Sequence, residues 1–186
     1  MSYKIIYLRS LFIMLLLIGA TSAWAQQPSP KLLTPTDHVL ILIDHQPQMA
    51  FATHSIDIVG LRNNVTGLAK AAKVFNVPVM LTTVAERTFS GPIFPEIQKV
   101  FPDQKPIDRT TMNTWEDERV VRKAKEYGKK KLVFAALWTE VCGVGPVLSA
   151  IGEGYDVYFV TDPSGGVRWL RAWYNLRKRN VRRAGR

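Results

Sequence analysis

Short apolar runs alternate along this chain with longer segments in which apolar residues recur every three or four positions. The short apolar runs lie at 39–43, 78–83, 131–137 and 155–161, and a shorter, more polar run at 105–109 stands between the second and third of the longer segments. Continuous apolar runs of this length, bounded by charged or turn residues, are typical of buried strands of a parallel sheet. The sequence therefore predicts five strands.

The segments between the runs predict helices at 57–76, 95–101, 116–127 and 141–154. The first helix carries apolar residues at helical spacing: Ile58, Leu61, Val65, Leu68 and Ala72. The third is amphipathic and ends before Gly128, a residue type that commonly terminates helices. Strands that alternate with helices form a parallel sheet with right-handed crossovers. The predicted fold class is therefore α/β, with three layers and an open, doubly wound, mostly parallel sheet.

Three reactive side chains come at the ends of predicted strands. Asp44 follows the first strand, Arg109 ends the third, and Cys142 lies at the turn between the fourth strand and its helix. The carboxyl ends of the strands of an open α/β sheet flank its ligand crevice. Cys142 is the only cysteine of the chain, and N–H groups at a helix N-terminus favour a thiolate. Each residue alone has an ordinary interpretation, but together they predict a site with a cysteine nucleophile.

The same residues stand in segments that resemble the isochorismatase-like cysteine hydrolases. The similar segments are Leu42-Ile43-Asp44-His45-Gln46, Arg109 followed by Asn113-Thr114-Trp115-Glu116-Asp117, Thr139-Glu140-Val141-Cys142, and two stretches at 148–157 and 160–165. The resemblance covers residues 32–166, most of the chain, and is strongest to the YcaC-type subgroup. That subgroup has arginine where nicotinamidases have a catalytic lysine, which agrees with Arg109.

The resemblance implies that Asp44 accepts the proton of Cys142 and that Arg109 keeps Asp44 ionised and oriented. The thiolate would attack the carbonyl carbon of a small amide, and water activated by Asp44 would then cleave the thioester. Relatives that split isochorismate cleave a vinyl ether and lack this cysteine. The presence of Cys142 therefore favours hydrolysis of an amide or another C–N bond.

The turn before Cys142 is expected to supply the oxyanion hole. By resemblance, backbone N–H groups at 139–142 would bind the oxyanion, and a cis peptide bond would join Trp138 and Thr139. Trp138 and Trp115 are candidates to line the substrate pocket, although packing in the core is an equally open interpretation for both. Glu140 is interpreted as a structural hydrogen-bonding or ion-pairing residue.

No metal or other cofactor is expected. Nicotinamidases add a metal site built on an Asp-x-His pattern, and residues 82–86 contain no such pattern. His38, His45 and His54 lack the spacing of metal ligands and are interpreted as polar or surface residues. Asp162, at the end of the fifth strand, is interpreted as structural.

The formal net charge of +10 is confined to the two ends of the chain. Residues 26–166 hold 15 basic and 15 acidic residues, so this part is neutral. A neutral body gives no reason to expect a nucleic acid or another polyanion as partner. The expected partner is a small-molecule substrate, and the family resemblance suggests a homo-oligomer.

Residues 1–25 have the form of a secretory signal peptide. Lys4 and Arg9 precede or border an apolar run at 11–20, and Ala23-Trp24-Ala25 is a small-x-small cleavage site. An uncleaved anchor is the alternative, but a span needs about 20 apolar residues. The sequence predicts export to the periplasm, with no stable membrane span after cleavage. A lone thiol carried into an oxidising compartment supports a chemical role for Cys142.

The last segment, 167–186, departs from the family pattern. It contains eight basic residues and no acid, where the family continues with a helix, a strand and a further helix. The predicted organisation is a signal peptide (1–25), a hydrolase domain (26–166) whose last strand and helix are missing or altered, and a divergent basic tail (167–186). A frameshift or truncation and a genuine basic amphipathic helix are both open explanations. The alternative function is therefore an inactive family member, or an interaction protein that acts through its tail.

Overall fold

The computed structural model describes residues 28–167, and the elements below belong to the compact unit that begins at Leu33. Five parallel strands form one sheet in the order β3-β2-β1-β4-β5. The strands are β1 (His38–Ile43), β2 (Val79–Val84), β3 (Ile107–Arg109), β4 (Lys131–Ala136) and β5 (Asp156–Phe159). β1 lies at the centre of the sheet between β2 and β4.

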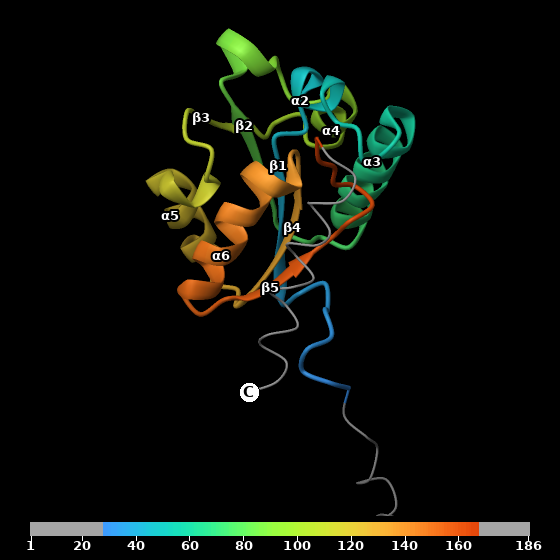
Figure 1. The fold of residues 1–186 in the computed structure, drawn as a ribbon. Coiled ribbons are helices and arrows are strands. Elements are labelled where there is room, and N and C mark those ends of the chain that lie inside the picture. The colour runs from blue at the N-terminus through green and yellow to red at the C-terminus, as the bar shows by residue number, and fades with distance from the viewer. Residues whose placement is uncertain (1–27, 168–186) are drawn as a thin grey trace, which may run out of the picture. The chain divides into compact units, whose positions relative to one another are not determined.

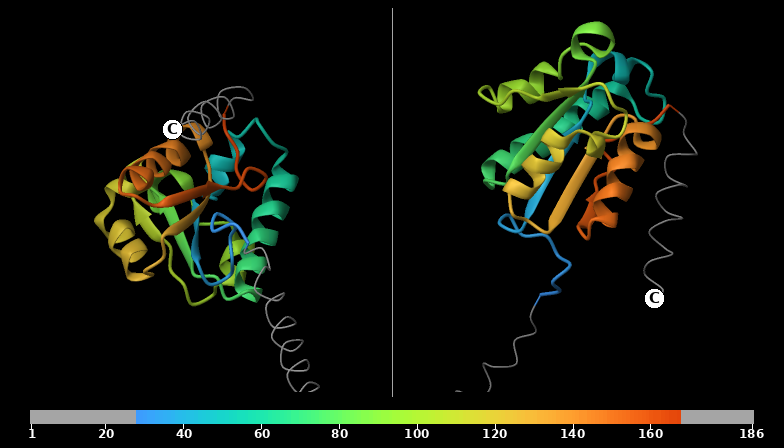
Figure 2. Two further views of the ribbon diagram at one scale, coloured as in Figure 1. Left: turned by 90° about the horizontal axis from the view of Figure 1, so that it is seen from below. Right: turned by 90° about the vertical axis from the view of Figure 1, so that its left-hand side faces the viewer.

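Helices cover both faces of the sheet, as Figures 1 and 2 show. One face carries α2 (Pro47–Phe51), α3 (Ile58–Val74) and α4 (Pro95–Val100). The other carries α5 (Glu118–Glu126) and α6 (Val144–Gly152). Short turns η2 (Glu86–Ser90), η3 (Thr114–Glu116) and η4 (Thr139–Gly143) complete the chain order. The α/β, three-layer, doubly wound parallel fold predicted from the sequence is confirmed.

The ends of the helices follow from local chemistry. Asp57 caps α3 by accepting a hydrogen bond from the N–H of Gly60 at 2.8 Å. The side chain of Asp117 caps α5 in the same way through the N–H of Arg119. After α5 the chain turns at Gly128, whose φ of +64° is a left-handed conformation that glycine adopts without a steric penalty.

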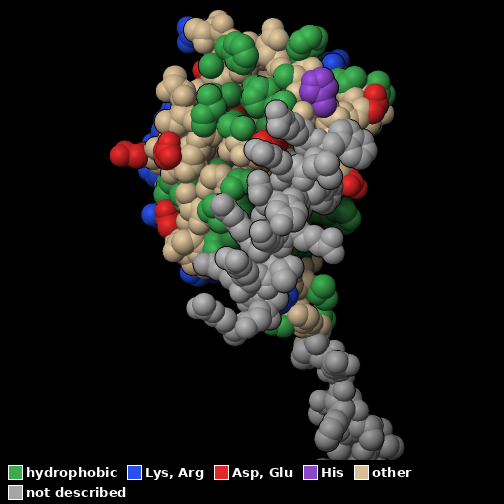
Figure 3. Space-filling model, viewed as in Figure 1, with side chains coloured by type: hydrophobic (Ala, Val, Ile, Leu, Met, Phe, Trp, Pro, Cys, Tyr) green, Lys and Arg blue, Asp and Glu red, His purple; other side chains and the backbone are tan. Residues whose placement is uncertain are grey.

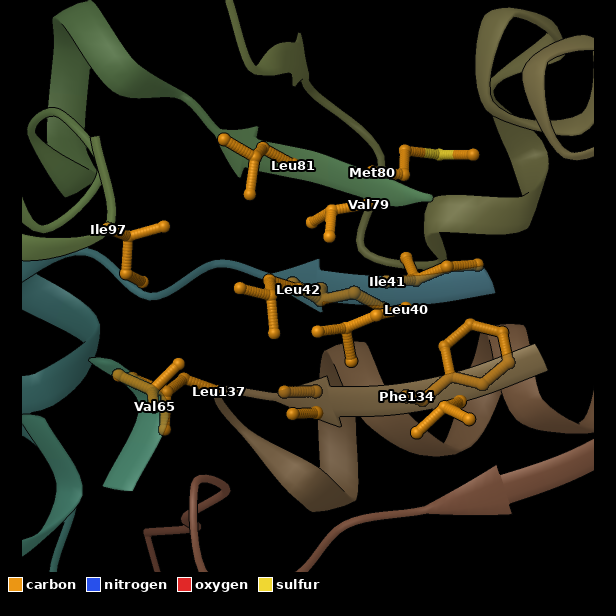
Figure 4. Close-up of a cluster of buried hydrophobic side chains, with 14 of the residues drawn as sticks. Leu40, Ile41, Leu42, Val65, Val79, Met80, Leu81, Ile97, Phe134 and Leu137 are labelled. Atoms are coloured by element: carbon orange, nitrogen blue, oxygen red, sulfur yellow. The ribbon is translucent and has the colours of Figure 1, made fainter. Parts of the chain in front are cut away.

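The core is the pair of central strands and the side chains packed against them. Every residue from Val39 to Ile43 is buried, and the same holds from Leu132 to Leu137. Figure 4 shows Leu40, Ile41 and Leu42 between residues of β2 and Phe134 of β4. Strands buried on both faces need this continuous apolar pattern, which is why the sequence revealed them.

The structure differs from the predicted elements mainly beyond the strand ends. The helix predicted over 141–154 divides into the π-helical turn η4 and the helix α6. Neither α2 nor η2 is predicted from the sequence, and each is five residues long. Short elements of this kind contain too few residues to display a periodic pattern.

An apolar pocket lies between α3 and the sheet, near the amino ends of the strands. Leu40, Leu68, Phe75, Val133 and Val160 contribute to its lining. This pocket is at the opposite end of the sheet from Asp44, Arg109 and Cys142. No helix in the described range 28–167 is long and apolar enough to cross a membrane.

The predicted signal peptide and all of the basic tail except Val167 lie outside the described residues. Export, periplasmic location, cleavage after residue 25 and the origin of the tail therefore stay predictions. Within the described part of the chain, β5 ends the sheet on one side and β3 on the other.

Candidate active site

The first candidate residue, Asp44, lies where β1 ends at the centre of the sheet. Its backbone is left-handed, with φ of +57°, and its N–H donates to Thr82 O on β2 at 3.1 Å. The N–H of Gln46 then donates back to Asp44 O at 2.8 Å, which closes a tight turn. A left-handed conformation is unfavourable for a residue with a Cβ, and such strain persists mainly at functional sites. The turn redirects the chain directly after the strand.

Gln46 holds this turn against β2. Its side-chain Nε2 donates to Val84 O at 3.2 Å and to Gly91 O at 2.5 Å, and its Oε1 accepts from the N–H of Val84 at 2.9 Å. The side chain is fully buried, so these bonds replace those it would make with water. The turn that carries Asp44 is therefore fixed on the β2 side.

Arg109 reaches Asp44 from the end of β3, two strands away. Its Nη2 donates to Asp44 Oδ2 at 2.5 Å, and its Nη1 donates to Thr111 O. Neither side chain of the ion pair has any exposed surface. A buried ion pair loses its hydration, and removal of one partner leaves an uncompensated buried charge. The pairing therefore holds the Asp44 carboxylate in one orientation.

Cys142 is brought to the same place by the π-helical turn after β4. The N–H groups of Val141 and Gly143 both donate to Trp138 O, at 3.0 and 3.1 Å. A Cβ on Gly143 would lie 3.3 Å from Ala136 Cβ and from the ring of Phe159, so the turn packs closely on the sheet. The Cys142 side chain is fully buried, and both Asp44 and Arg109 act on its pKa. The structure thus brings together the three residues singled out from the sequence.

Burial dominates the ionisation of this site. It raises the pKa of Asp44 to about 6, although Arg109 and Cys142 act in the opposite direction. Burial, and then the charge of Asp44, raise the pKa of Cys142 to about 12. The expectation that the helix terminus leaves Cys142 as a thiolate is therefore wrong for the free site. At neutral pH the pair holds a thiol beside an ionised carboxylate, a donor with a matching acceptor.

Two expectations about the oxyanion turn also need correction. The cis peptide bond joins Leu137 and Trp138, one bond before the position expected. The N–H of Thr139 donates to Gly165 O at 2.8 Å and that of Val141 to Trp138 O, so both are occupied. Thr139 supports the turn and does not present a free donor. Of the N–H groups predicted to bind the oxyanion, those of Thr139 and Val141 are therefore excluded. The N–H groups of Glu140 and Cys142 stay the candidates.

The two tryptophans have different surroundings. Trp115 is 6% exposed, packs edge-on against Phe134 and Tyr155, and donates from Nε1 to Glu153 Oε1 at 2.9 Å. Glu153 follows α6 near the amino ends of the strands, so these contacts favour the packing interpretation of Trp115. Trp138 is half-buried at the start of the Cys142 turn, and its Nε1 donates to Met49 O at 2.7 Å.

The burial of His45 differs most from the prediction made from the sequence. It was interpreted as polar or exposed, but it is fully buried, and burial lowers its pKa to about 4. Its Nε2 lies 2.7 Å from Pro163 O. Because a carbonyl oxygen only accepts, Nε2 carries the proton of the neutral ring. Nδ1 has no hydrogen-bond partner.

No group of three or more potential ligands from His, Cys, Asp and Glu is placed to hold a metal ion in residues 28–167. The expectation that the site works without a metal stays a prediction. The surface around the carboxyl ends of the strands is partly apolar, as the upper part of Figure 3 shows. Phe51, Phe89, Met112 and Val141 are the exposed hydrophobic side chains of the segments that follow these strands.

The fold and site identify the class of this protein. The model of the isochorismatase domain matches residues 38–169, which include all three clustered residues. The chain therefore belongs to the isochorismatase family.

Particular relatives make the likeness more specific. The chain is 42% identical over 134 residues to the probable hydrolase YcaC of Escherichia coli, an alignment that covers 72% of this chain and 64% of that protein. The crystal structure of the E. coli YcaC gene product, described as an octameric hydrolase of unknown specificity, matches with a TM-score of 0.76 at 39% identity, over 82% of this chain and 76% of that one.

Two further solved structures agree in fold. YcaC from Pseudomonas aeruginosa, with hexane-2,5-diol and covalent acrylamide, has a TM-score of 0.76 at 35% identity, over 82% of this chain and 77% of the other. A nicotinamidase from Bacillus subtilis has a TM-score of 0.67 at 12% identity, over 76% and 93% of the two chains. At that identity the nicotinamidase supports the fold alone.

Proposed function

We propose that this protein is a cysteine hydrolase that cleaves a small amide or a related C–N bond through a thioester. The observation that carries the proposal is the buried cluster in which Arg109 pairs with the Asp44 carboxylate and the charge of that carboxylate acts on the Cys142 thiol. A thiol with a general base beside it, and a third group that orients the base, is the arrangement of an activated nucleophile.

The first half of the reaction forms the thioester. Asp44, ionised above its pKa of about 6, takes the proton of Cys142 as sulfur bonds to the substrate carbonyl carbon. The carbonyl electron pair moves to oxygen, where the N–H groups of Glu140 and Cys142 are the proposed donors. Asp44 then gives its proton to the leaving nitrogen, the C–N bond breaks, and an amine or ammonia departs.

The second half regenerates the enzyme. Asp44 is again ionised and takes a proton from water, whose oxygen attacks the thioester carbon. The C–S bond breaks, the acid product leaves, and the proton on Asp44 returns to the Cys142 sulfur. Arg109 stays charged throughout, because an arginine does not lose its proton in the working pH range. It orients Asp44 and limits the rise in its pKa.

The size of the substrate follows from burial. Asp44 and Cys142 have no exposed surface and Arg109 has 2%, so only a small molecule is expected to reach the sulfur. Trp138 is the proposed aromatic wall of the pocket, because its ring is half-buried at the start of the Cys142 turn. The P. aeruginosa relative was solved with covalent acrylamide, which supports the presence of a reactive nucleophile in proteins of this kind.

The direct test compares the protein with its Cys142→Ala variant on a panel of small primary amides, with ammonia release as the readout. We expect activity in the parent protein and a loss of about 10³-fold or more in the variant, since the nucleophile is removed. Acid-quenched mass spectrometry should detect an acyl group on Cys142, and acrylamide should add to the same residue. Hydrolysis by Cys142→Ala at the parental rate would contradict the proposal.

We also propose that the protein forms a homo-oligomer, as the octameric E. coli relative does. Light scattering coupled to size exclusion would measure its mass in solution.

A further inference from the structure

Residues 163–167, here called the strap, run from the end of the β5 segment across the ends of β1 and β4. We propose that the strap is a positioning element that fixes Asp44 and the Cys142 turn relative to each other, with His45 and Glu140 as its two side-chain anchors. This inference rests on the proposed function, because it concerns the geometry of the same base and nucleophile.

On the Asp44 side, the strap is held by His45. The imidazole donates from Nε2 to Pro163 O at 2.7 Å, and it belongs to the residue that directly follows Asp44. The ring is fully buried and stays neutral above about pH 4, so this bond does not change over the working pH range. The ring also stands edge-on to Phe94 at 6.2 Å, which restricts its orientation. Movement of the strap at Pro163 is therefore transmitted to the turn at Asp44.

On the Cys142 side, the strap makes three separate connections. Gly165 O accepts from the N–H of Thr139 at 2.8 Å and from its Oγ1 at 3.1 Å. Ser164 Oγ accepts from the N–H of Ala136 at 3.0 Å, at the end of β4. Glu140 Oε1 accepts from the N–H of Val167 at 2.7 Å. The turn that carries Cys142 is thus bonded to the strap both at its first residue and through Glu140.

A third group of contacts ties the strap to the loop before α3. The N–H groups of His54 and Ser55 donate to Gly166 O at 3.0 and 3.2 Å. The N–H of Gly166 donates to Ser55 Oγ at 2.8 Å. The strap is therefore anchored to a segment that belongs to neither the Asp44 turn nor the Cys142 turn.

The strap has no room to shift. A Cβ on Gly165 would lie 2.6 Å from Thr53 Cγ2, and one on Gly166 would lie 2.2 Å from Glu140 Oε2. Both distances are below any ordinary contact of a Cβ, so a side chain at either position would displace Thr53 or Glu140. Close packing on both sides restricts the movement of the strap more than its hydrogen bonds alone would.

A fixed position of the strap is important because catalysis depends on the distance between the base and the nucleophile. A displacement of about 1 Å in a reacting group reduces rate by about 10²-fold. Asp44 comes from β1 and Cys142 from the turn after β4, and these two segments have no covalent connection near the site. The strap contacts both segments and thereby fixes their positions relative to each other.

The test uses paired variants at the two anchors. His45→Leu and Glu140→Ala remove the bonds to Pro163 and Val167, whereas His45→Gln and Glu140→Gln keep a donor and an acceptor of similar reach. We expect the first pair to lower kcat about 10- to 100-fold with KM changed less than about threefold. The second pair should recover most of kcat. Asp162→Ala, an exposed position one residue before the strap, is the matched control and should behave as the parent protein.

A second readout needs no substrate. The alkylation rate of Cys142 by iodoacetamide, followed from pH 5 to 9, reports how Asp44 and the thiol are coupled. We expect the pH profile to change in His45→Leu and Glu140→Ala and to be retained in both glutamine variants. If the anchors affect only stability, the melting temperatures will fall while kcat per folded molecule and the alkylation profile stay parental, and the positioning role is then wrong.

The two readouts separate the strap from the chemistry. Should Cys142→Ala retain amide hydrolysis, the proposed function fails, whereas the alkylation profiles still decide whether the strap couples Asp44 to Cys142. Should Cys142→Ala be inactive and the anchor variants fully active with parental alkylation, the proposed function stands and the strap is overturned.

Discussion

Residues 39–43 and 44–46 are adjacent in the chain and equally buried, but their burial has opposite energetic consequences. The first segment is the apolar body of β1, with exposed fractions of 0–2%. Burying each of its large side chains contributes about 1.5–3 kcal/mol to folding. The second segment buries Asp44, His45 and Gln46 completely. Polar groups that lose water stabilise the fold only if they find partners.

Within residues 44–46, some buried polar atoms have hydrogen-bond partners and others have none. Gln46 has hydrogen bonds at both side-chain atoms, whereas Asp44 Oδ1 and His45 Nδ1 have none. Asp44 also has a left-handed backbone and a raised pKa. Unfavourable features that gather at two residues, beside a segment free of them, agree with the proposed roles of Asp44 as base and of His45 in positioning it. The strand body supplies the stability that the turn lowers.

The largest expected effect is the loss of catalysis in Asp44→Asn. The amide keeps the size of the carboxylate and an oxygen that can accept from Arg109, but it cannot take the proton of Cys142. General base catalysis contributes about 10²–10⁴-fold, so we expect kcat/KM to fall by about 10³-fold. Steady-state ammonia release on the best amide gives the ratio, and far-UV circular dichroism checks that the variant is folded. A variant with more than a tenth of the parental activity would show that Asp44 is not the base.

How far the sequence predicts each segment follows from the same contrast. Residues 39–43 and 131–137 were recognised as strands because burial of a parallel strand requires an uninterrupted apolar run. Asp44, Arg109 and Cys142 were found because reactive side chains at strand ends are visible in a sequence. Their mutual geometry then followed from the parallel topology.

The strap was not predicted, and the reason is physical. Its contacts use backbone atoms: Pro163 O, Gly165 O and both polar atoms of Gly166. Backbone donors and acceptors are present at almost every residue, so no side-chain pattern reveals which of them are used. The pair Gly165-Gly166 was the available signal, since adjacent glycines often mark a close approach of the backbone. The raised pKa of Cys142 was missed as well, because it depends on burial by distant segments.

The next largest effect is on stability and belongs to the strand body. Leu42→Ala removes a side chain with no exposed surface from the centre of the sheet, and we expect a loss of about 3–5 kcal/mol in the free energy of unfolding. Urea denaturation measures this loss. The activity per folded molecule should stay close to the parental value, because Leu42 contacts the core and not the site. A loss below about 1 kcal/mol would mean that the central strand is less tightly packed than its burial indicates.

The smallest expected effect concerns pH, where Asp44 and His45 oppose each other. The folded pKa of Asp44 is raised from 3.8 to about 6, so its contribution to stability is fully present below pH 3.8 and is lost as pH rises through 6. The folded pKa of His45 is lowered from 6.5 to about 4, so its contribution is present above pH 6.5 and is lost as pH falls through 4. Each shift corresponds to about 3 kcal/mol, and the signs are opposite. Between pH 4 and 6.5 the changes of the two contributions with pH therefore nearly cancel.

Single variants should reveal the separate effects of Asp44 and His45 on the pH dependence of the free energy of unfolding. Relative to the parent protein, Asp44→Asn leaves His45 alone, so its free energy of unfolding should rise with pH between 4 and 6.5. His45→Gln leaves Asp44 alone, so its free energy of unfolding should fall over the same range, by up to about 3 kcal/mol. Urea denaturation at half-unit pH steps gives both slopes, and differences from the parent remove the contributions of other groups. The parent protein should meanwhile gain activity as pH rises through about 6, because only ionised Asp44 accepts the thiol proton. Parallel slopes in the two variants would mean that burial does not shift these neighbouring groups in opposite directions, and the energetic contrast between 39–43 and 44–46 would then rest on the backbone strain and the unpartnered atoms alone.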